Sequence, residues 1–296
     1  MIAARPEDQD RTIVVTGGNR GIGYALVAAL ADRGYRVIFT SRDLDRGRQA
    51  LARLGEERPA RTLQMEICDL SSPASIRAFA GQLLDRSTPI HGLINNAGVL
   101  RPPEERVITE DGIEATLATN AIGPMLLTIA LEPALAAASD ARVLILTSRL
   151  HLPGSRGGPV DFDLSDPNLE HGYSPDRAYK NSKLAAIWVA KELDRRLVPT
   201  VRCDAVCPGF VPTTAAAYVT GWRRFLLRNV LPRFTFTTTL EQAAADVIWA
   251  LDAPELAGRG GQYMVGRQVA EPSPDASDEA LARQFWTLAD QLIGGN

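Results

Sequence analysis

Lysine is almost missing from this chain of 296 residues, which has three lysines against 29 arginines. Charges of the two signs nearly balance, with a formal net charge of -3, so the sequence predicts no basic surface for nucleic acid. Cysteine is also scarce: three residues are too few for a disulfide framework. We interpret Cys203 and Cys207 as buried thiols in a reducing compartment rather than as metal ligands, and no metal site is predicted.

Long apolar runs are missing as well. No stretch approaches the ~20 apolar residues that a membrane-spanning helix needs. Residues 1–15 carry acids where an export signal would be basic and then apolar. We therefore expect a cytoplasmic protein that has no membrane partner.

What the chain does contain is an alternation of β-branched runs and Ala/Leu-rich helical stretches. Val143 to Leu146 are apolar at every position, as in parallel strands that are covered on both faces. The alternation predicts a single α/β domain over residues 1–296, doubly wound, with a mainly parallel seven-stranded sheet and helices on both faces. The strands whose positions can be predicted are 12–16, 35–40, 61–67, 91–96, 141–148 and 201–207. The predicted helices are 21–33, 44–54, 73–86, 112–138 and 176–198.

Three segments depart from this alternation. Residues 149–178 are rich in Gly, Pro and Asp and are interpreted as a long surface insertion. Residues 213–240 are amphipathic and aromatic, which favours a substrate lid, although a surface helix that covers the core would have the same pattern. Residues 267–296 form a C-terminal tail.

A glycine-rich loop, TGGNRGIG, follows the first predicted strand and opens the first helix. Glycines allow a tight turn and a close approach to a ligand, while the helix N-terminus offers free N–H groups to a phosphate. The second strand ends with Ser41 and Arg42, where NAD-binding proteins generally have an acid. Arg42 and Arg20 suit the 2′-phosphate of NADP, so we predict NADP(H) as the cofactor; the alternative is that both are solvated.

Two of the three lysines follow a tyrosine in one stretch, DRAYKNSKLAAIW. Tyr179 and Lys183 are four positions apart on a predicted helix and share a face. A cation ~4 Å from a phenol, at an effective dielectric of ~20, lowers a tyrosine pKa of ~10 by up to about three units. A compact ammonium can also bind a ribose hydroxyl. Lys180, one step around the helix, is expected to be exposed.

Further motifs follow in order along the chain. They are Asp69 in CDL, NNAG (95–98), Asn120 in ATNAIGP, Ser148 in ILTS, YKNSK (179–183) and PGFVPT (208–213). With the glycine loop, this set resembles the short-chain dehydrogenase/reductase family over residues 12–266. The resemblance implies a Rossmann fold and an oxidoreductase.

The resemblance also implies catalytic roles. Tyr179 is the expected general acid/base, and Ser148 is expected to bind the substrate oxygen. Lys183 would bind the nicotinamide ribose and lower the tyrosine pKa, while Asn120 would hold a proton-relay water. Ser148 could instead be an ordinary strand-end hydroxyl, and Asn120 could bond to nearby carbonyls and bend its helix.

For the cofactor, the resemblance places Asp69 at the adenine and Asn95 in the ribose region. Asp69 could instead hold the turn before Ser71, and Asn95 and Gly98 could chiefly shape the exit of the fourth strand. The expected cofactor-binding residues are Gly17, Asn19, Arg20, Gly21, Ile22, Gly23, Ser41, Arg42, Asp69, Leu70, Asn96, Ala97, Gly98, Tyr179, Lys183, Pro208, Gly209, Val211 and Thr213.

The spacing of 31 residues between Ser148 and Tyr179 is unusually long for the family and resembles its retinol-dehydrogenase-like branch. Members of that branch act on bulky hydrophobic aldehydes, ketones or alcohols. Arg149 and His151, just after the serine, could contact a polar substrate or form a salt bridge within the insertion.

We therefore expect NADPH-dependent reduction of a ketone or aldehyde, or the reverse alcohol oxidation, on a bulky hydrophobic small molecule, which a secondary metabolite could be. The alternative from another class is a non-catalytic NADP(H)-sensing binding protein on the same fold. A light-driven or double-bond reductase is a third option. A homodimer or homotetramer through helices 112–138 and 176–198 is possible, unless the insertion or the tail blocks it.

Overall fold

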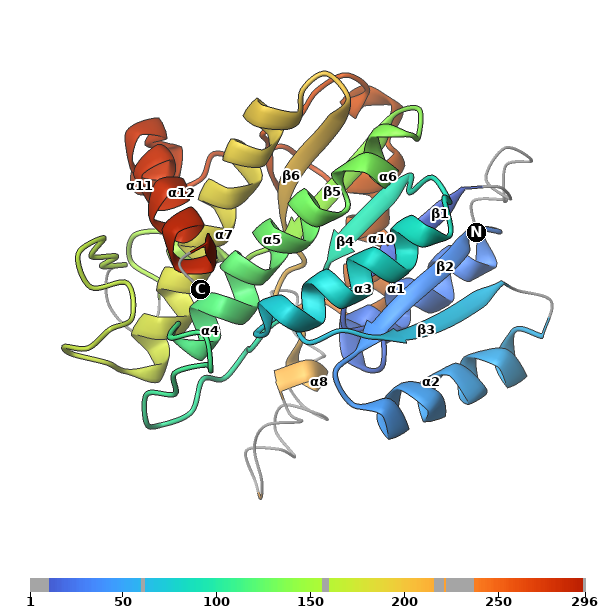
Figure 1. The fold of residues 1–296 in the computed structure, drawn as a ribbon, viewed down its shortest axis with the longest axis horizontal. Coiled ribbons are helices and arrows are strands. Elements are labelled where there is room, and N and C mark those ends of the chain that lie inside the picture. The colour runs from blue at the N-terminus through green and yellow to red at the C-terminus, as the bar shows by residue number, and fades with distance from the viewer. Residues whose placement is uncertain (1–10, 60–61, 156–159, 216–220, 222–236, 295–296) are drawn as a thin grey trace.

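The sheet has seven parallel strands in the order β3-β2-β1-β4-β5-β6-β7 (Figure 1). The structure is a computed structural model that describes residues 11–59, 62–155, 160–215, 221 and 237–294. The predicted doubly wound sheet is confirmed, and its seventh strand, whose position the sequence left open, is β7. The strands are β1 (Thr12–Val15), β2 (Arg36–Ser41), β3 (Leu63–Ile67), β4 (Gly92–Asn95), β5 (Ala141–Leu146), β6 (Val201–Cys207) and β7 (Tyr263–Val265).

Helices cover both faces of the sheet, which explains why its inner strands are apolar throughout. Successive side chains of a strand point to opposite faces. In β5, Val143 and Ile145 therefore join one hydrophobic cluster, and Leu144 and Leu146 join the other. The first cluster includes residues of α3 (Pro73–Asp85), α5 (Gly123–Ala130) and α7 (Pro175–Leu197). The second includes residues of α1 (Gly21–Asp32), α2 (Leu44–Glu57) and α10 (Leu240–Asp252).

The prediction of one continuous helix over 112–138 is wrong, because this segment is divided. Pro133 cannot donate a backbone hydrogen bond, and the helix is interrupted just before it. A π-helical turn is inserted upstream, and π-turns in helices occur frequently at functional sites. The pieces are α4 (Ala115–Leu117), the π-turn Ala118–Ile122, α5, and α6 (Glu132–Ala136).

The C-terminal tail packs against the body of the domain. It contains α11 (Pro274–Ser277) and α12 (Glu279–Gly294), of which α12 lies along α7 (Figure 1). The rings of Trp188 and Phe285 lie 5.7 Å apart, and Phe162 of the insertion contacts both at 5.3 and 5.5 Å. The tail and the insertion therefore share one aromatic cluster on α7.

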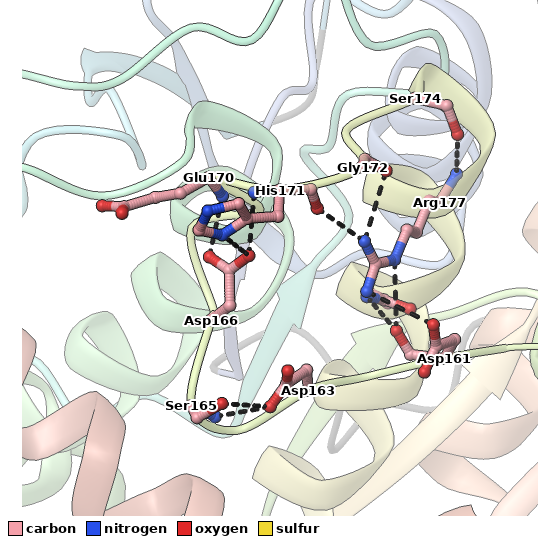
Figure 2. Close-up of polar contacts among 10 residues, drawn as sticks. Asp161, Asp163, Ser165, Asp166, Glu170, His171, Gly172, Ser174 and Arg177 are labelled. Atoms are coloured by element: carbon pink, nitrogen blue, oxygen red, sulfur yellow. Dashed lines mark hydrogen bonds and ion pairs between the residues drawn. The ribbon is translucent and has the colours of Figure 1, made fainter.

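Carboxylates of the insertion accept hydrogen bonds from neighbouring residues of the same segment, as Figure 2 shows. Asp163 accepts hydrogen bonds from the backbone and hydroxyl of Ser165, and Asp166 accepts from two backbone amides at 170 and 171. Arg177, in the first turn of α7, donates to the carbonyls of His171 and Gly172 and pairs with Asp161. These contacts attach the insertion to the helix that carries Tyr179.

Across the part of the chain that the structure describes, no helix combines the length and the apolar character needed to cross a membrane.

Candidate active site

Most of the predicted site residues follow the carboxyl ends of β1, β2, β3, β4, β5 and β6. Because these strands are parallel, their carboxyl ends meet at one edge of the sheet. The glycine loop follows β1, residues 96–98 follow β4, Ser148 follows β5 and Pro208 follows β6. Tyr179 and Lys183 reach the same edge from α7. The fold therefore brings together groups that lie up to about 190 residues apart in the sequence.

The glycine loop has the shape that a dinucleotide phosphate requires. Gly17 and Gly21 have φ angles of +68° and +58°, which side-chain-bearing residues rarely adopt. A Cβ at Gly23 would lie 2.2 Å from the carbonyl oxygen of Gly17, so the loop and α1 touch only because that side chain is missing. No side chain caps the first turn of α1, which leaves its N–H groups suited to an anion. These features fit the pyrophosphate of a nicotinamide dinucleotide.

The segment after β4 supports this loop. The Asn96 amide donates to the carbonyls of Thr16 and Gly17 at 2.8 and 3.2 Å, and the Ala97 amide donates to the Thr16 hydroxyl. Asn96 thus holds the glycine loop in place. Asn95, by contrast, is buried against α5, where its amide lies 3.4 Å from the Thr128 hydroxyl, so its side chain packs between β4 and α5 while that of Asn96 bonds to the glycine loop.

At the end of β2, Ser41 and Arg42 have different surroundings. Ser41 is buried, and its hydroxyl bonds to the backbone carbonyl and amide of Asp43. Arg42 is exposed, so its guanidinium is the group at this strand end that solvent reaches. After β3, Asp69 accepts hydrogen bonds from the amide and hydroxyl of Ser71 with one carboxylate oxygen. Asp69 therefore holds the turn that leads into α3, whatever else it contacts.

Tyr179 and Lys183 lie side by side on α7. The Lys183 ammonium is 5.8 Å from the centroid of the Tyr179 ring and donates to the carbonyl of Leu146, the last residue of β5, at 2.9 Å. Burial lowers the pKa of Lys183 to about 8, and the Cys207 thiol nearby acts in the opposite direction. A Cβ at Gly98 would lie 3.5 Å from this ammonium, so the segment after β4 runs directly past the lysine.

Asn120 occupies the π-turn and joins the segment after β4 to α7. Its Oδ1 accepts from the Val99 amide at 2.7 Å, and its Nδ2 donates to the Val99 carbonyl and the Ser182 hydroxyl. Ser182 in turn donates to the backbone carbonyl of Tyr179 at 2.7 Å. Asn120 makes these hydrogen bonds from within the π-turn Ala118–Ile122, where the helix is wider than an α-helix. The π-turn was not predicted from the sequence, because it is recognised by the hydrogen bonds of Asn120 and not by the residue types of the segment.

Ser148 is half-buried and directly follows the end of β5. Its hydroxyl accepts a hydrogen bond from the Leu150 amide at 3.3 Å. The preceding residue, Thr147, is fixed from two sides: its hydroxyl donates to the Lys183 carbonyl and its amide donates to the Val206 carbonyl. Ser148 therefore lies at the same sheet edge as Lys183, although 35 residues separate the two in sequence.

Two further expectations about charged or titratable residues are wrong. Lys180 is buried, with 1% of its surface exposed. Among the residues that the structure describes, His151 forms no ion pair within the insertion. It is buried in a short 3₁₀ turn, Arg149–His151, and its Nδ1 contacts the carbonyl of Ser148. Its position three residues after Ser148 is visible in the sequence, but the contact with the Ser148 carbonyl was neither of the two alternatives that the sequence suggested.

The segment after β6 makes a tight bend. Gly209 has a φ of +81°, and a Cβ there would lie 2.2 Å from the Thr238 hydroxyl. Thr238 also donates its amide to the Phe210 carbonyl, so residues 208–211 and 237–240 lie against each other. α8 (Pro212–Ala215) follows. The predicted lid at 213–240 lies mostly outside the described residues.

Comparisons with known proteins agree with this geometry. The family model described as short chain dehydrogenase matches residues 11–160. Polyprenol dehydrogenase of Mus musculus is 35% identical over 298 residues, which cover 98% of this chain and 85% of that protein. Retinol dehydrogenase 13 of Homo sapiens is 35% identical over 289 residues, which cover 96% of this chain and 85% of that protein.

A solved structure has the same fold. The crystal structure of an uncharacterised protein from Mycobacterium Paratuberculosis is 30% identical, with a TM-score of 0.69, and the match covers 96% of this chain and 93% of that chain. Sequence and fold thus agree over nearly the whole length. The chain belongs to the short chain dehydrogenase family of oxidoreductases, in its retinol-dehydrogenase-like branch.

Proposed function

We propose that this oxidoreductase uses NADPH to reduce the carbonyl group of a bulky hydrophobic aldehyde or ketone, and NADP⁺ to oxidise the corresponding alcohol. The observation that carries the proposal is the buried ammonium of Lys183 beside the ring of Tyr179, 5.8 Å from its centroid, at the edge of the sheet where the glycine loop lies. A buried cation favours the ionised form of a neighbouring phenol. This is the electrostatic condition for a tyrosine that exchanges protons near neutrality.

The chain supplies the proton chemistry. When bound, the cofactor supplies the hydride that adds to the carbonyl carbon. The Tyr179 hydroxyl donates its proton to the substrate oxygen as that oxygen gains negative charge, and the Ser148 hydroxyl donates a hydrogen bond to the same oxygen. In the oxidation direction, Tyr179 accepts the proton. Asn120 connects the π-turn to Val99, after β4, and to Ser182 of α7 through hydrogen bonds.

Several residues are suited to hold the cofactor. The first turn of α1 would bind the pyrophosphate, and the Lys183 ammonium has donors for a ribose hydroxyl. Arg42 is exposed at the end of β2, and Arg20 is exposed at the start of α1. Two guanidinium groups at this edge favour the 2′-phosphate of NADP(H) over the unmodified ribose of NAD(H).

The substrate class is inferred from the relatives. The similar proteins are named polyprenol and retinol dehydrogenases, so retinal and a short polyprenal are the first substrates to test. The exposed apolar side chain of Phe210 follows the bend after β6, at the edge of the sheet where the substrate would bind. An apolar residue at this position suits a hydrophobic substrate.

The decisive experiment compares wild type with Tyr179→Phe. We expect the variant to lose at least about a hundredfold in turnover of retinal, because it lacks the proton donor. NADPH binding, measured by fluorescence titration, should change less than about threefold. A wild-type protein that binds NADPH tightly but reduces no member of an aldehyde and ketone panel would instead support a cofactor-sensing protein.

A further inference from the structure

His151 is the buried side chain next to the active site to which the proposed chemistry assigns no role. We propose that His151 is a positioning residue: it fixes the backbone of Ser148 and thereby the direction of the Ser148 hydroxyl. This inference rests on the proposed function, since it needs Ser148 to bind the substrate oxygen.

The first argument is a short hydrogen bond whose direction is determined by chemistry. The His151 Nδ1 lies 2.6 Å from the backbone carbonyl oxygen of Ser148. A carbonyl can only accept, so Nδ1 must carry the proton, and the neutral ring then has a bare lone pair on Nε2. Burial lowers the pKa of His151, which favours this neutral form. The neutral ring therefore donates to the Ser148 carbonyl through Nδ1.

The second argument is that the ring itself cannot move easily. Only 2% of the His151 surface is exposed, and the ring packs edge-on against Tyr263 of β7, with centroids 4.9 Å apart at 87°. Edge-to-face contacts of this kind stabilise one orientation of a ring. His151 is therefore held by the last strand of the sheet, while it holds the residue that follows β5.

The unpartnered atoms of this ring pair support a specific role. Within the described residues, neither His151 Nε2 nor the Tyr263 hydroxyl has a hydrogen-bond partner that meets normal geometry, and both are buried. Burial raises the pKa of Tyr263, and the nearby Cys207 thiol raises it further. A buried polar residue with one unsatisfied nitrogen costs stability that an apolar residue would not. Of the two ring nitrogens, Nδ1 is the one that has a hydrogen-bond partner among the described residues, the Ser148 carbonyl.

The third argument is that Ser148 lies between two fixed points. On one side, Thr147 is bonded to α7 through the Lys183 carbonyl. On the other side, the 3₁₀ turn begins, and the Ser148 hydroxyl accepts from the Leu150 amide at a long 3.3 Å. The bond from His151 is the short contact that closes this turn. Without it, the serine hydroxyl would lose a defined direction relative to Tyr179.

The test is a double-mutant cycle with retinal and NADPH. His151→Phe keeps the ring and its contact with Tyr263 but removes the donor. His151→Asn keeps a donor, because the asparagine amide can take the place of ring Nδ1. Each change is also made in a Ser148→Ala background, with kcat, KM and the NADPH dissociation constant measured for every variant. His91→Phe is the matched control: His91 also contacts the backbone, at Thr12 N, but at the opposite edge of the sheet.

We expect His151→Phe to lower kcat about tenfold to a hundredfold with little change in the NADPH dissociation constant. His151→Asn should recover kcat to within about threefold of wild type, and His91→Phe should keep the wild-type kcat. In the Ser148→Ala background, His151→Phe should cost nothing further, because a residue that acts only through Ser148 has nothing left to position.

Three results would overturn the inference. The first is equal losses in His151→Phe and His151→Asn, and the second is a loss of the same size with and without Ser148. The third is wild-type kcat in His151→Phe while Ser148→Ala is inactive. That result contradicts the proposed role of His151 but leaves the proposed function intact. Wild-type turnover in Ser148→Ala would refute the proposed function itself, together with this inference.

Discussion

Two buried cations lie at opposite ends of β5, and the protein treats them differently. Arg142, at the amino end, forms a buried ion pair with Asp204 of β6 and also donates to the carbonyls of Leu256 and Arg259 at 2.6 and 3.1 Å. Lys183 reaches the carboxyl end, where its ammonium bonds to the Leu146 carbonyl. Among the described residues, no carboxylate forms an ion pair with Lys183.

The difference separates a structural charge from a functional one. The guanidinium of Arg142 has several acceptors, so most of its desolvation cost is offset locally, and it connects β5 to the segment before β7. The Lys183 charge is not neutralised, and its burial lowers its pKa to about 8. An unneutralised buried charge costs stability but acts strongly on groups beside it, here the phenol of Tyr179.

The largest expected effect is on turnover and comes from removing the functional cation. Lys183→Met keeps a long apolar stem without a charge. We expect kcat/KM for retinal to fall about a thousandfold or more, because both the activated phenol and a ribose donor are lost. The same variant should unfold at an equal or higher urea concentration than wild type, since a desolvated charge has been removed. A large loss of stability would contradict the distinction between the two cations.

The structural cation should show the opposite pattern. Arg142→Met leaves Asp204 buried without its partner, and we expect the free energy of unfolding to fall by about 3–5 kcal/mol. Replacing both partners, as Arg142→Met with Asp204→Leu, should recover most of this loss, because no uncompensated charge remains. Urea unfolding measures the stability, and kcat of the folded fraction should stay near wild type in both variants. If kcat of Arg142→Met falls as far as that of Lys183→Met, then the loss of the Arg142–Asp204 pair disturbs the active site at the other end of β5.

The contrast between these cations also shows what the sequence could predict. YKNSK indicated that Tyr179 and Lys183 share a face, because spacing on a helix determines this. The residues of the glycine loop were predicted together because backbone conformation limits them to glycine. The pairing of Arg142 with Asp204 was not foreseen, since it depends on the register of β5 against β6, which sets Arg142 opposite Arg202, two positions from Asp204 along β6.

The same reasoning explains the errors. Lys180 was expected on the surface because it lies one step around the helix from Tyr179, but its side chain is buried in the fold. Asn95 ends β4 and Asn96 directly follows it, so a one-residue difference decides which of the two asparagines contacts the glycine loop. The division of the predicted helix 112–138 has two local causes: Pro133, which the sequence contains, and a π-turn around Asn120, which no periodicity reveals.

Alkaline pH should reduce the stability cost of Lys183. Its pKa in the folded protein, about 8, lies below the 10.5 of an exposed lysine. Between these values the unfolded chain binds more protons than the folded one, so stability rises with pH; the cost is fully present below pH ~8 and is relieved above it. The shift corresponds to roughly 3 kcal/mol.

This pH effect is measured as a difference between two proteins. Wild type and Lys183→Met are unfolded in urea at several values between pH 7.5 and 10, so that other groups titrating in this range cancel. We expect any stability advantage of the variant to shrink as the pH rises. A difference that does not change with pH would mean that Lys183 keeps its ordinary pKa in the folded protein.

The smallest effect concerns a third cation, Arg42, which is exposed at the end of β2 and has solvent rather than buried neighbours. Arg42→Ala should leave both the free energy of unfolding and kcat with saturating NADPH near wild type. It should raise KM for NADPH about tenfold while KM for NADH stays unchanged, because one charge-assisted contact to a 2′-phosphate is worth about 1.5–3 kcal/mol before solvent screening reduces it. Arg48→Ala, on the exposed face of α2, is the matched control for a general change in charge. If the two arginine variants have the same ratio of KM values for NADPH and NADH, Arg42 does not select the cofactor, and an exposed cation at this edge is only solvated.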